Sequence, residues 1–416
     1  MKFNFSRYNL FGFLGGLVLL ILPIFFDKNF NGGWFSVLFY MLLILIGVSI
    51  SICFLAKMCS IDPIYVFLLA GLCEIGIFLS IQAIKNDQIT SPSLIKKCRS
   101  FYTSYLRSIP AYQSGLGKYD TDLFYTLKPN ISDNNLDYVI NANIEFSNTY
   151  KINSLGVRDD EFSLNFPEII VLGDSHSMGW GVDQNRTFSS LLEQQIKKKV
   201  LNTGIASYGS AREYLMFSKV KNDSCKTVIW QYCANDMLEN QSFLENGNQL
   251  KVSSEEGYEF VCKRNFIQAS YYPFKFSFEI FAHQFRRIKG RNKFKNQPKF
   301  EISEQVNNFF SIVKLLQEDF AGEIIIFNLE SNKTTDKYFL AFKNYLKNNH
   351  LEKIKLINFS KILNEDDYFI IDDHINVSGH QKVSDAILKI IQSELDTISE
   401  KLIACLFLKE GLTFLK

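Results

Sequence analysis

The chain has 416 residues, which is enough for more than one domain and for a full hydrophobic core. Its 45 Lys and Arg residues nearly balance its 43 Asp and Glu residues, which argues against a chain-wide nucleic-acid surface. The 8 cysteines include no CxxC spacing. This excludes a zinc ribbon and a dense disulfide framework and leaves room for one bridge.

The first 85 residues are far more apolar than the rest, and they contain three almost uncharged runs, at about 9–26, 34–56 and 63–84. Each run is long enough to cross a hydrocarbon core of about 30 Å as a helix. We therefore predict a multi-pass membrane protein with three transmembrane helices, the alternative being two spans and a re-entrant or buried helix. Glu74 is the only charge inside these runs, and we expect it at a helix-packing or headgroup-level position.

The basic residues near the runs do not fix the orientation of the chain. Their count leans slightly toward a cytoplasmic carboxyl-terminal domain, because more of them flank the side that holds this domain. Long domains, however, cross membranes largely regardless of charge. Our expectation is an extracytoplasmic carboxyl-terminal domain, although the charges leave the side open.

After the apolar region, polar residues 86–110 predict a linker, and 111–166 form a β-rich lead-in of short alternating segments. Apolar strands then alternate with amphipathic helices over 167–398, which predicts an α/β domain with a parallel sheet covered on both faces. An insertion at 237–300 interrupts this alternation and contains a basic stretch at 286–299, and a carboxyl-terminal tail follows at 399–416. The basic stretch is either an exposed loop or a lid that touches anionic headgroups or a polyanionic glycan.

The short sequence "GDSHS" directly follows the apolar strand 169–172 and places Ser175 at a strand end. Ligand sites of parallel α/β sheets lie at the carboxyl ends of their strands. A hydroxyl becomes a nucleophile only when a base accepts its proton and a third group orients that base. At other strand ends we find Asn235 and the loop 203–209, and Asp372 and Asp373 stand just before His374 in a loop that leads into the last helix.

Four blocks, "GDSHSMGWGV", "NTGIASYG", "AND" and "DDHINVSGH", occur in the order and spacing of a known family. Over about 167–395 the chain resembles the SGNH/GDSL-type serine esterases and acyltransferases. The upstream segments "YDTDLFYTLKPN" and "INSLGVRDDEF" resemble membrane-attached bacterial members of that family.

The resemblance implies a flavodoxin-like α/β/α fold that needs no metal and no cofactor. It also implies Ser175 as nucleophile, His374 as general base, and an oxyanion hole formed by the Ser175 backbone N–H, the second-block loop and the Asn235 side chain. The family offers a glycine where this chain has Ser207, so the donor there must be a backbone N–H group. Gly204 and Gly209 are alternative donors.

The third member of the triad departs from the family pattern. The acid of the family stands three residues before the histidine, where this chain has Ile371. Asp372 fits the variant of some polysaccharide-modifying relatives, and we assign the acid to Asp372 over Asp373.

Several neighbouring residues have two interpretations. We expect Asp174 to stabilise the turn, and His176 either lines the substrate entrance or has no role that we can name. Trp180 packs the turn or stacks on a sugar. Arg158 pairs with Asp159 or reaches an anionic substrate, and His380 has a structural role on its helix. These residues stand beside the expected triad of Ser175, His374 and Asp372 and do not change its assignment.

We thus expect a membrane-anchored esterase or O-acyltransferase that forms an acyl-serine intermediate. Its expected substrate is an acylated carbohydrate or other ester, with O-acetyl groups of an envelope or extracellular polysaccharide foremost. The expected partners are the lipid bilayer and polysaccharide-assembly proteins, without nucleic acid. The alternative is a non-catalytic scaffold of such an assembly system. A channel or transporter would rest on Glu74 alone.

Overall fold

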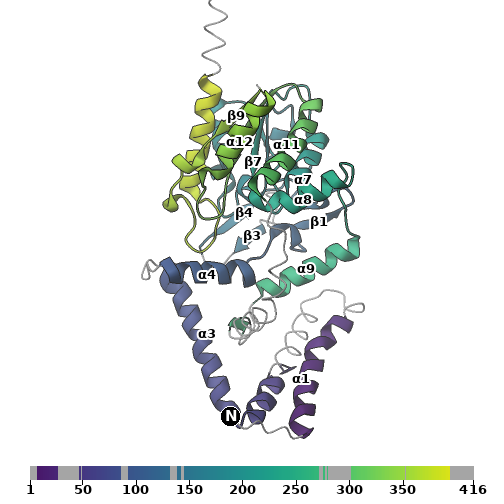
Figure 1. Cartoon of the computed structure of the whole chain (residues 1–416), viewed down its shortest axis with the longest axis vertical. Helices are drawn as coiled ribbons and strands as arrows, with labels where there is room; N and C mark the ends of the chain where they lie inside the picture. The colour runs from purple at the N-terminus through teal and green to yellow at the C-terminus, as the bar shows by residue number, and fades with distance from the viewer. Residues whose placement is uncertain are drawn as a thin grey trace, which may run out of the picture. The chain divides into compact units, whose positions relative to one another are not determined.

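The computed structural model describes residues 7–26, 46–47, 49–85, 92–131, 138–141, 145–270, 275–276, 279, 301–351 and 353–393. The chain divides into two compact units (Figure 1). One unit comprises Met1–Leu94 with Ser270–Pro298, and the other comprises Ile95–Ala269 with Lys299–Lys416. The predicted basic stretch and the carboxyl-terminal tail lie outside the described residues.

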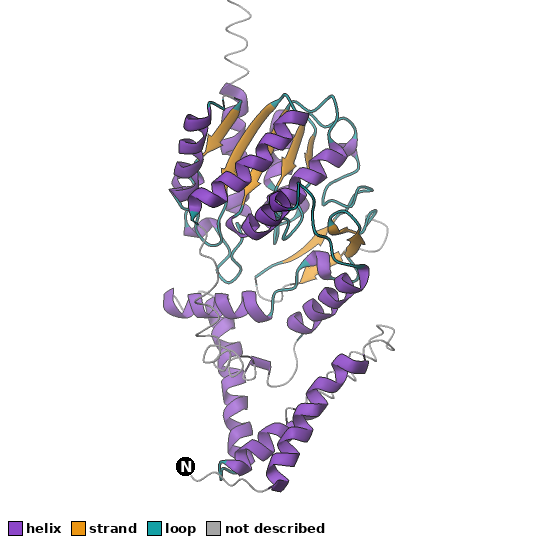
Figure 2. Ribbon diagram, turned by 45° about the vertical axis from the view of Figure 1, so that its right-hand side comes forward, coloured by secondary structure: helices purple, strands orange, loops and turns teal. Residues whose placement is uncertain are grey.

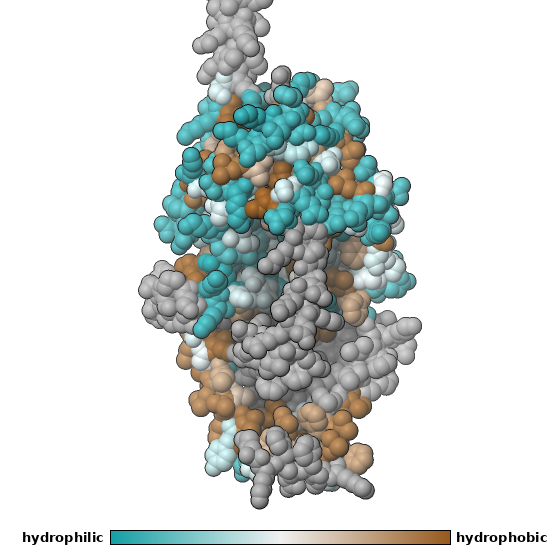
Figure 3. All heavy atoms as spheres, in the orientation of Figure 1, coloured by the Kyte–Doolittle hydropathy of each residue, from teal (hydrophilic) through white to brown (hydrophobic). Residues whose placement is uncertain are grey.

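The N-terminal unit contains helices α1 (Arg7–Phe26) and α3 (Pro63–Lys85) and the apolar helix Ser49–Met58. Large apolar side chains of α3 are exposed, and these helices form hydrophobic surface in Figure 3. Within the described part of the chain, one stretch, Pro63–Ser80, is long and apolar enough to cross a membrane. The structure therefore has one candidate span where the sequence predicts three, and the predicted run 34–56 lies partly outside the described residues.

Glu74, the acid inside the third apolar run, is buried within the N-terminal unit. Its carboxylate accepts a hydrogen bond from the backbone N–H of Phe276 at 3.2 Å. Phe276 belongs to the insertion, so part of this insertion packs with the N-terminal helices. Glu74 thus occupies a packing position, and this contact gives no support to a transport function.

The second unit is built on a five-stranded parallel sheet in the order β6-β5-β7-β8-β9. Its strands are β5 (Ile169–Leu172), β6 (Val200–Asn202), β7 (Thr227–Tyr232), β8 (Glu323–Asn328) and β9 (Ile354–Ile357). Counted along the chain, this is the 2-1-3-4-5 order of flavodoxin-like folds, whose ligands bind where the first and third strands adjoin. Those strands are β5 and β7, which lead to Ser175 and Asn235.

Helices cover both faces of the sheet (Figure 2). Ile170 and Leu172 of β5 join a hydrophobic cluster with α7 (Ser210–Val220), α11 (Ile302–Asp319) and α12 (Asp336–Asn349). Ile169 and Val171 join a cluster with α6 (Phe188–Ile196) and the helix at 377–393. Because successive strand residues face opposite sides, an uninterrupted apolar strand needs both layers. The predicted α/β fold with a parallel sheet is confirmed.

The lead-in consists of two antiparallel pairs, β1 (Gly117–Asp120) with β2 (Phe124–Leu127) and β3 (Tyr138–Asn141) with β4 (Ser147–Tyr150). The insertion begins with helices α8 (Met237–Glu245) and α9 (Glu255–Ala269). The short helical turns are α5 (Ser175–Met178), η2 (Pro110–Tyr112), η3 (Phe162–Leu164), η4 (Gln184–Arg186), η5 (Ala234–Asp236), η7 (Phe359–Lys361) and η8 (Glu365–Asp367).

The segment predicted as a linker contains helix α4 (Pro92–Tyr105). Proline is well tolerated at the first position of a helix, where its missing N–H costs nothing. Cys98 and Tyr102, four residues apart, are both buried and so lie on one face of the helix. The polar composition hid this narrow buried stripe, and from Ile95 onward the helix belongs to the second unit.

Candidate active site

Ser175 is the first residue of the short helix α5, directly beyond the carboxyl end of β5. Asp174 caps this helix, since its carboxylate accepts the backbone N–H of His176 at 2.9 Å. Gly173 makes the tight turn possible, because a Cβ atom there would lie 2.2 Å from the Ser177 hydroxyl oxygen. The turn leaves Ser175 half-buried at the sheet edge, and Asp174 has the turn-stabilising position that the sequence predicts.

The structure brings Ser175, His374 and Asp372 into one hydrogen-bonded chain. His374 Nε2 lies 2.7 Å from Ser175 Oγ, and His374 Nδ1 lies 2.5 Å from Asp372 Oδ1. The same Asp372 oxygen also accepts the His374 backbone N–H at 3.1 Å. Asp373 Oδ1 is farther from His374 Nδ1, at 3.4 Å. Of the two acids, Asp372 is therefore the closer partner of the imidazole.

The environment of Asp372 keeps its carboxyl group ionised. Only 1% of the residue is exposed, and this burial alone would raise its pKa. His374 and Arg107 outweigh the burial, so the pKa of Asp372 lies well below its usual range. An ionised acid can orient the imidazole and stabilise the positive charge that forms when the imidazole accepts a proton.

Two further rings enclose the imidazole of His374. Trp180 stacks on it at a centroid distance of 5.2 Å and an interplanar angle of 19°. The ring of His176 lies beside the imidazole, tilted by 47° with the ring centroids 4.8 Å apart, and His176 is 2% exposed. Burial and the nearby His374 lower the pKa of His176 to about 4, so its ring is neutral near pH 7. Trp180 is buried, and its stacking on His374 is a contact beyond the two roles that the sequence predicts. The burial of His176 is incompatible with a place in an open substrate entrance.

The candidate oxyanion donors differ in availability. The Gly204 N–H is already bound to Asn202 Oδ1 at 3.0 Å, and the Gly209 N–H is bound to Glu239 at 3.1 Å. Ser207 is exposed and lines a pocket with Ser175, and its φ of 66° is a left-handed value that favours glycine. Asn235 is exposed in η5, at the end of the strand next to β5.

The pocket above Ser175 encloses about 140 Å³ and is lined by Thr103, Arg107, Ile109, Ser175, Trp180, Ala206, Ser207, Gln268 and His374. Thr103 belongs to α4, Arg107 and Ile109 to the segment that follows it, and Gln268 to α9. Sequence reasoning assigned these segments to a linker and an insertion. Residues of both segments line the pocket as well.

A second group of residues, which sequence reasoning missed, holds the loop 370–374. Arg107 donates to Asp373 and lies 3.6 Å from Asp372. Arg99 donates to the Ile370 carbonyl at 2.8 Å. The Glu145 carboxylate accepts the backbone N–H groups of Ile370 and Asp372 at 2.5 and 2.6 Å. Because at least 225 residues separate these partners, no local motif could indicate the contacts.

Arg158 has neither of its two predicted partners. It is 1% exposed and donates to three backbone carbonyls of the loop 178–182. Asp159 instead accepts the Asn202 N–H at 2.7 Å, and burial raises its pKa to about 8. His380 is buried, and its Nδ1 accepts the Phe188 backbone N–H at 3.1 Å, which agrees with a structural role.

Asp372, Asp373 and His374 also carry potential metal ligand atoms within 4.8 Å of one another. The His374 nitrogens face Ser175 and Asp372, while Asp373 binds Arg107. These contacts use the potential ligand atoms for one another and for a cation of the protein. The arrangement therefore fits a hydrogen-bonded relay better than a metal centre.

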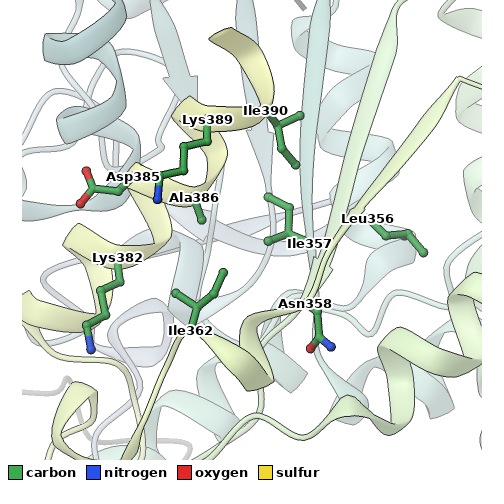
Figure 4. Close-up of a pocket in the computed structure, with 9 residues that line it drawn as sticks. All are labelled: Leu356, Ile357, Asn358, Ile362, Lys382, Asp385, Ala386, Lys389 and Ile390. Atoms are coloured by element: carbon green, nitrogen blue, oxygen red, sulfur yellow. The ribbon is translucent and has the colours of Figure 1, made fainter. Parts of the chain in front are cut away.

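A larger hollow of about 490 Å³ lies between β9 and the helix at 377–393 (Figure 4). No member of the Ser175 cluster lines it. Two of its charged groups have partners: Lys382 binds Asp367 at 2.7 Å, and Asp385 accepts from Gln195 and Gln381. Size alone does not make this hollow a site.

The site as a whole joins a serine hydroxyl, an imidazole and a carboxylate at the switch point of the parallel sheet. No family model and no curated protein matches the chain. Solved structures with similarity to it include a member of the lipolytic protein G-D-S-L family from Veillonella parvula, with 14% identity and a TM-score of 0.34, covering 54% of this chain and 97% of that chain.

Two carbohydrate esterases are also similar to this chain. One is a carbohydrate esterase family 2 enzyme with a carbohydrate-binding domain from Corynascus thermopiles, with 12% identity, a TM-score of 0.33 and coverage of 55% of this chain and 67% of that chain. The other is an acetyl xylan esterase from Butyrivibrio proteoclasticus, with 10% identity, a TM-score of 0.32 and coverage of 55% and 64%.

Proposed function

We propose that this chain is a serine-dependent esterase or O-acyltransferase that works through an acyl-Ser175 intermediate. The observation that carries the proposal is the continuous hydrogen-bonded chain from Ser175 Oγ through His374 to Asp372, next to a pocket. A turn serine without this role would need no buried imidazole and no ionised, buried carboxylate beside it.

In the first half of the reaction, Ser175 Oγ attacks the acyl carbonyl carbon while its proton moves to His374 Nε2. The carbonyl oxygen gains negative charge in the tetrahedral adduct. The backbone N–H groups of Ser175 and Ser207 and the Asn235 amide are the donors we assign to this oxygen. Collapse of the adduct breaks the bond to the leaving alkoxide, which takes the proton from His374.

In the second half, an acceptor hydroxyl attacks the acyl-serine carbonyl and gives its proton to His374 Nε2. The bond between the acyl carbon and Ser175 Oγ then breaks, and the proton returns to this oxygen. Water as acceptor makes the protein an esterase, and a sugar hydroxyl makes it an O-acyltransferase. Both reactions use the same residues in the same roles.

The small pocket supports a short acyl group. Pockets for drug-sized ligands enclose roughly 300–1,000 Å³, whereas the pocket at Ser175 encloses about 140 Å³. We infer an O-acetyl ester as the reacting group and, from the sequence resemblance, an envelope or extracellular polysaccharide as its carrier. The candidate span Pro63–Ser80 supports anchoring in a membrane. The multi-pass arrangement and the extracytoplasmic side remain parts of this proposal.

The test is hydrolysis of p-nitrophenyl acetate by the full chain in detergent, alongside Ser175→Ala and His374→Ala. We expect turnover in the parent and a loss of at least about a thousandfold in both variants. Ser154→Ala, a change at an exposed serine of the lead-in, is the matched control and should keep the parental rate.

Equal turnover by the parent and by Ser175→Ala would refute the proposed nucleophile. A folded parent without turnover, even with an acetylated donor and a glycan acceptor present, would favour the alternative of a non-catalytic scaffold. In that case Ser175→Ala should keep the cellular role of the protein.

A further inference from the structure

The loop 178–182, which follows the Ser175 turn, has an unusual construction. Gly179 and Gly181 have left-handed φ values of 81° and 83°, which residues with a side chain rarely adopt. Arg158, itself 1% exposed, donates to the carbonyls of Met178 at 3.1 Å, Gly179 at 2.5 Å and Val182 at 2.6 Å. Burying a guanidinium is costly unless its contacts offset the lost hydration. This loop is therefore held in one defined shape.

Trp180 lies in this loop between the two glycines and is 2% exposed. Its indole Nε1–H donates to Asp372 Oδ2 at 3.2 Å. Its ring stacks on the imidazole of His374 at 5.2 Å and 19°. Asp372 uses its other oxygen, Oδ1, for His374 Nδ1. One indole thus contacts both the acid and the base of the relay.

Each contact supports a different requirement of the proposed reaction. The hydrogen bond fixes the rotation of the Asp372 carboxylate, so that Oδ1 stays directed at the imidazole. The stacked ring fixes the imidazole plane, and tryptophan is the aromatic side chain that best attracts a positive charge over its face. His374 gains such a charge when it takes the Ser175 proton.

We propose that Trp180 is a positioning residue of the relay, acting through Asp372 and His374. This inference rests on the proposed function, because it assumes that His374 accepts the Ser175 proton. In this arrangement the buried Arg158 holds the loop that carries the Trp180 indole. Trp180 lines the pocket, but its polar atom is bound to Asp372 and is thereby committed to the relay.

Other charged or titratable groups face Asp372 and His374, so the test must separate their effects from that of the indole. Asp373 and Arg107 adjoin the relay from the histidine loop and from the segment after α4, and His176 adjoins it from α5. Arg107 also lies over the Trp180 ring at 5.9 Å. A double-mutant cycle isolates one pairwise effect from this background.

The experiment measures kcat and KM for p-nitrophenyl acetate in the full-chain parent, Trp180→Phe, Asp372→Asn and the double variant. Phenylalanine keeps a stacking ring and removes the Nε1–H donor. We expect Trp180→Phe to lower kcat about tenfold, the effect of losing one hydrogen bond to a charged group, with KM within about twofold of the parental value. In the Asp372→Asn background the same change should cost less than about twofold, since the two residues act as one unit.

The matched control is Trp230→Phe, which also removes an indole bond to a buried carboxylate, that of Glu213 at 2.7 Å. Trp230 lies in β7, outside the relay, so its effect should be the same in both Asp372 backgrounds. A merely structural Trp180 would behave like Trp230, with effects that multiply in the double variant, and this result would overturn the proposal. Unchanged kcat in Trp180→Phe would overturn it as well. Loss of activity in Ser175→Ala alongside either result would leave the proposed function intact and reject only the role of Trp180.

Discussion

Two regions of the second unit meet at His374, and they are built in different ways. The sheet edge carries Ser175 and Asn235 directly beyond the ends of adjacent parallel strands, so their positions follow from the strand order. The clamp, which we define as Arg99, Arg107 and Glu145, holds the histidine loop from segments outside the sheet. A residue of the sheet edge can be found from its local sequence, whereas a residue of the clamp can be found only from the folded chain.

The largest effect expected at the sheet edge, apart from the triad itself, is that of Asn235→Ala. Loss of one oxyanion donor typically lowers kcat about 100- to 1,000-fold. We expect this loss in kcat for p-nitrophenyl acetate, with little change in KM, because the donor acts on charge that develops in the transition state. A full-rate Asn235→Ala variant would remove Asn235 from the oxyanion hole.

The clamp should have a smaller effect on the rate. Arg107→Gln removes the cation that binds Asp373 and lies near Asp372, and we expect kcat to fall about 10- to 100-fold. Arg99→Gln is the matched control, because Arg99 holds the same loop through the Ile370 carbonyl without contacting either acid. Equal losses in the two variants would mean that the clamp acts by loop order alone and that the charge of Arg107 has no separate role.

The stability of the second unit depends on pH through the side chain of His176. Its pKa in the folded chain is lowered to about 4 by burial and by His374, against the influence of Asp174, Asp373 and Asp372. The unfolded chain takes up its proton near pH 6.5, so the unfolded state gains protons first as the pH falls. The stabilisation is therefore complete above about pH 6.5 and declines toward pH 4, by up to about 3 kcal/mol.

The measurement is the thermal unfolding midpoint of the second unit at pH 7 and pH 4.5. We expect His176→Gln to lose less stability than the parent over this interval, while the exposed His350→Gln control follows the parent. Parallel losses in the parent and in His176→Gln would contradict a buried, neutral His176.

The smallest effect is expected at Ser207. Glycine there would relieve the left-handed φ of 66°, which should raise stability by about 1 kcal/mol. It should keep kcat within about twofold, because the proposed donor is the backbone N–H group. A large loss of kcat in Ser207→Gly would show that the side-chain hydroxyl takes part in the reaction.

The sequence predicted what depends on local pattern. The apolar strand ending in Gly-Asp-Ser and the Asp-Asp-His loop can each be read within about twenty residues. The alternation of strands and helices predicts the parallel sheet that carries Ser175 at a strand end. The sequence draws attention to Trp180 as a residue of the serine turn. Its hydrogen-bond partner Asp372 lies 192 residues away, so local sequence does not reveal this contact.

Helix α4 was missed for a related reason. Its buried stripe, with Cys98 and Tyr102, is narrow, and its other positions are polar, so composition indicated a linker. The packing partners that make this stripe a helix face come from distant parts of the chain, and tertiary packing supplies most of the stability of such a helix.

In the proposed mechanism, Ser175 is a nucleophile that His374 activates. The most direct measurement is the covalent labelling of the folded full chain by a fluorophosphonate, followed by mass spectrometry of its peptides. We predict one modified residue, Ser175, with labelling at least about a hundredfold slower in His374→Ala. Labelling at another residue, or equal rates in the parent and in His374→Ala, would contradict the account.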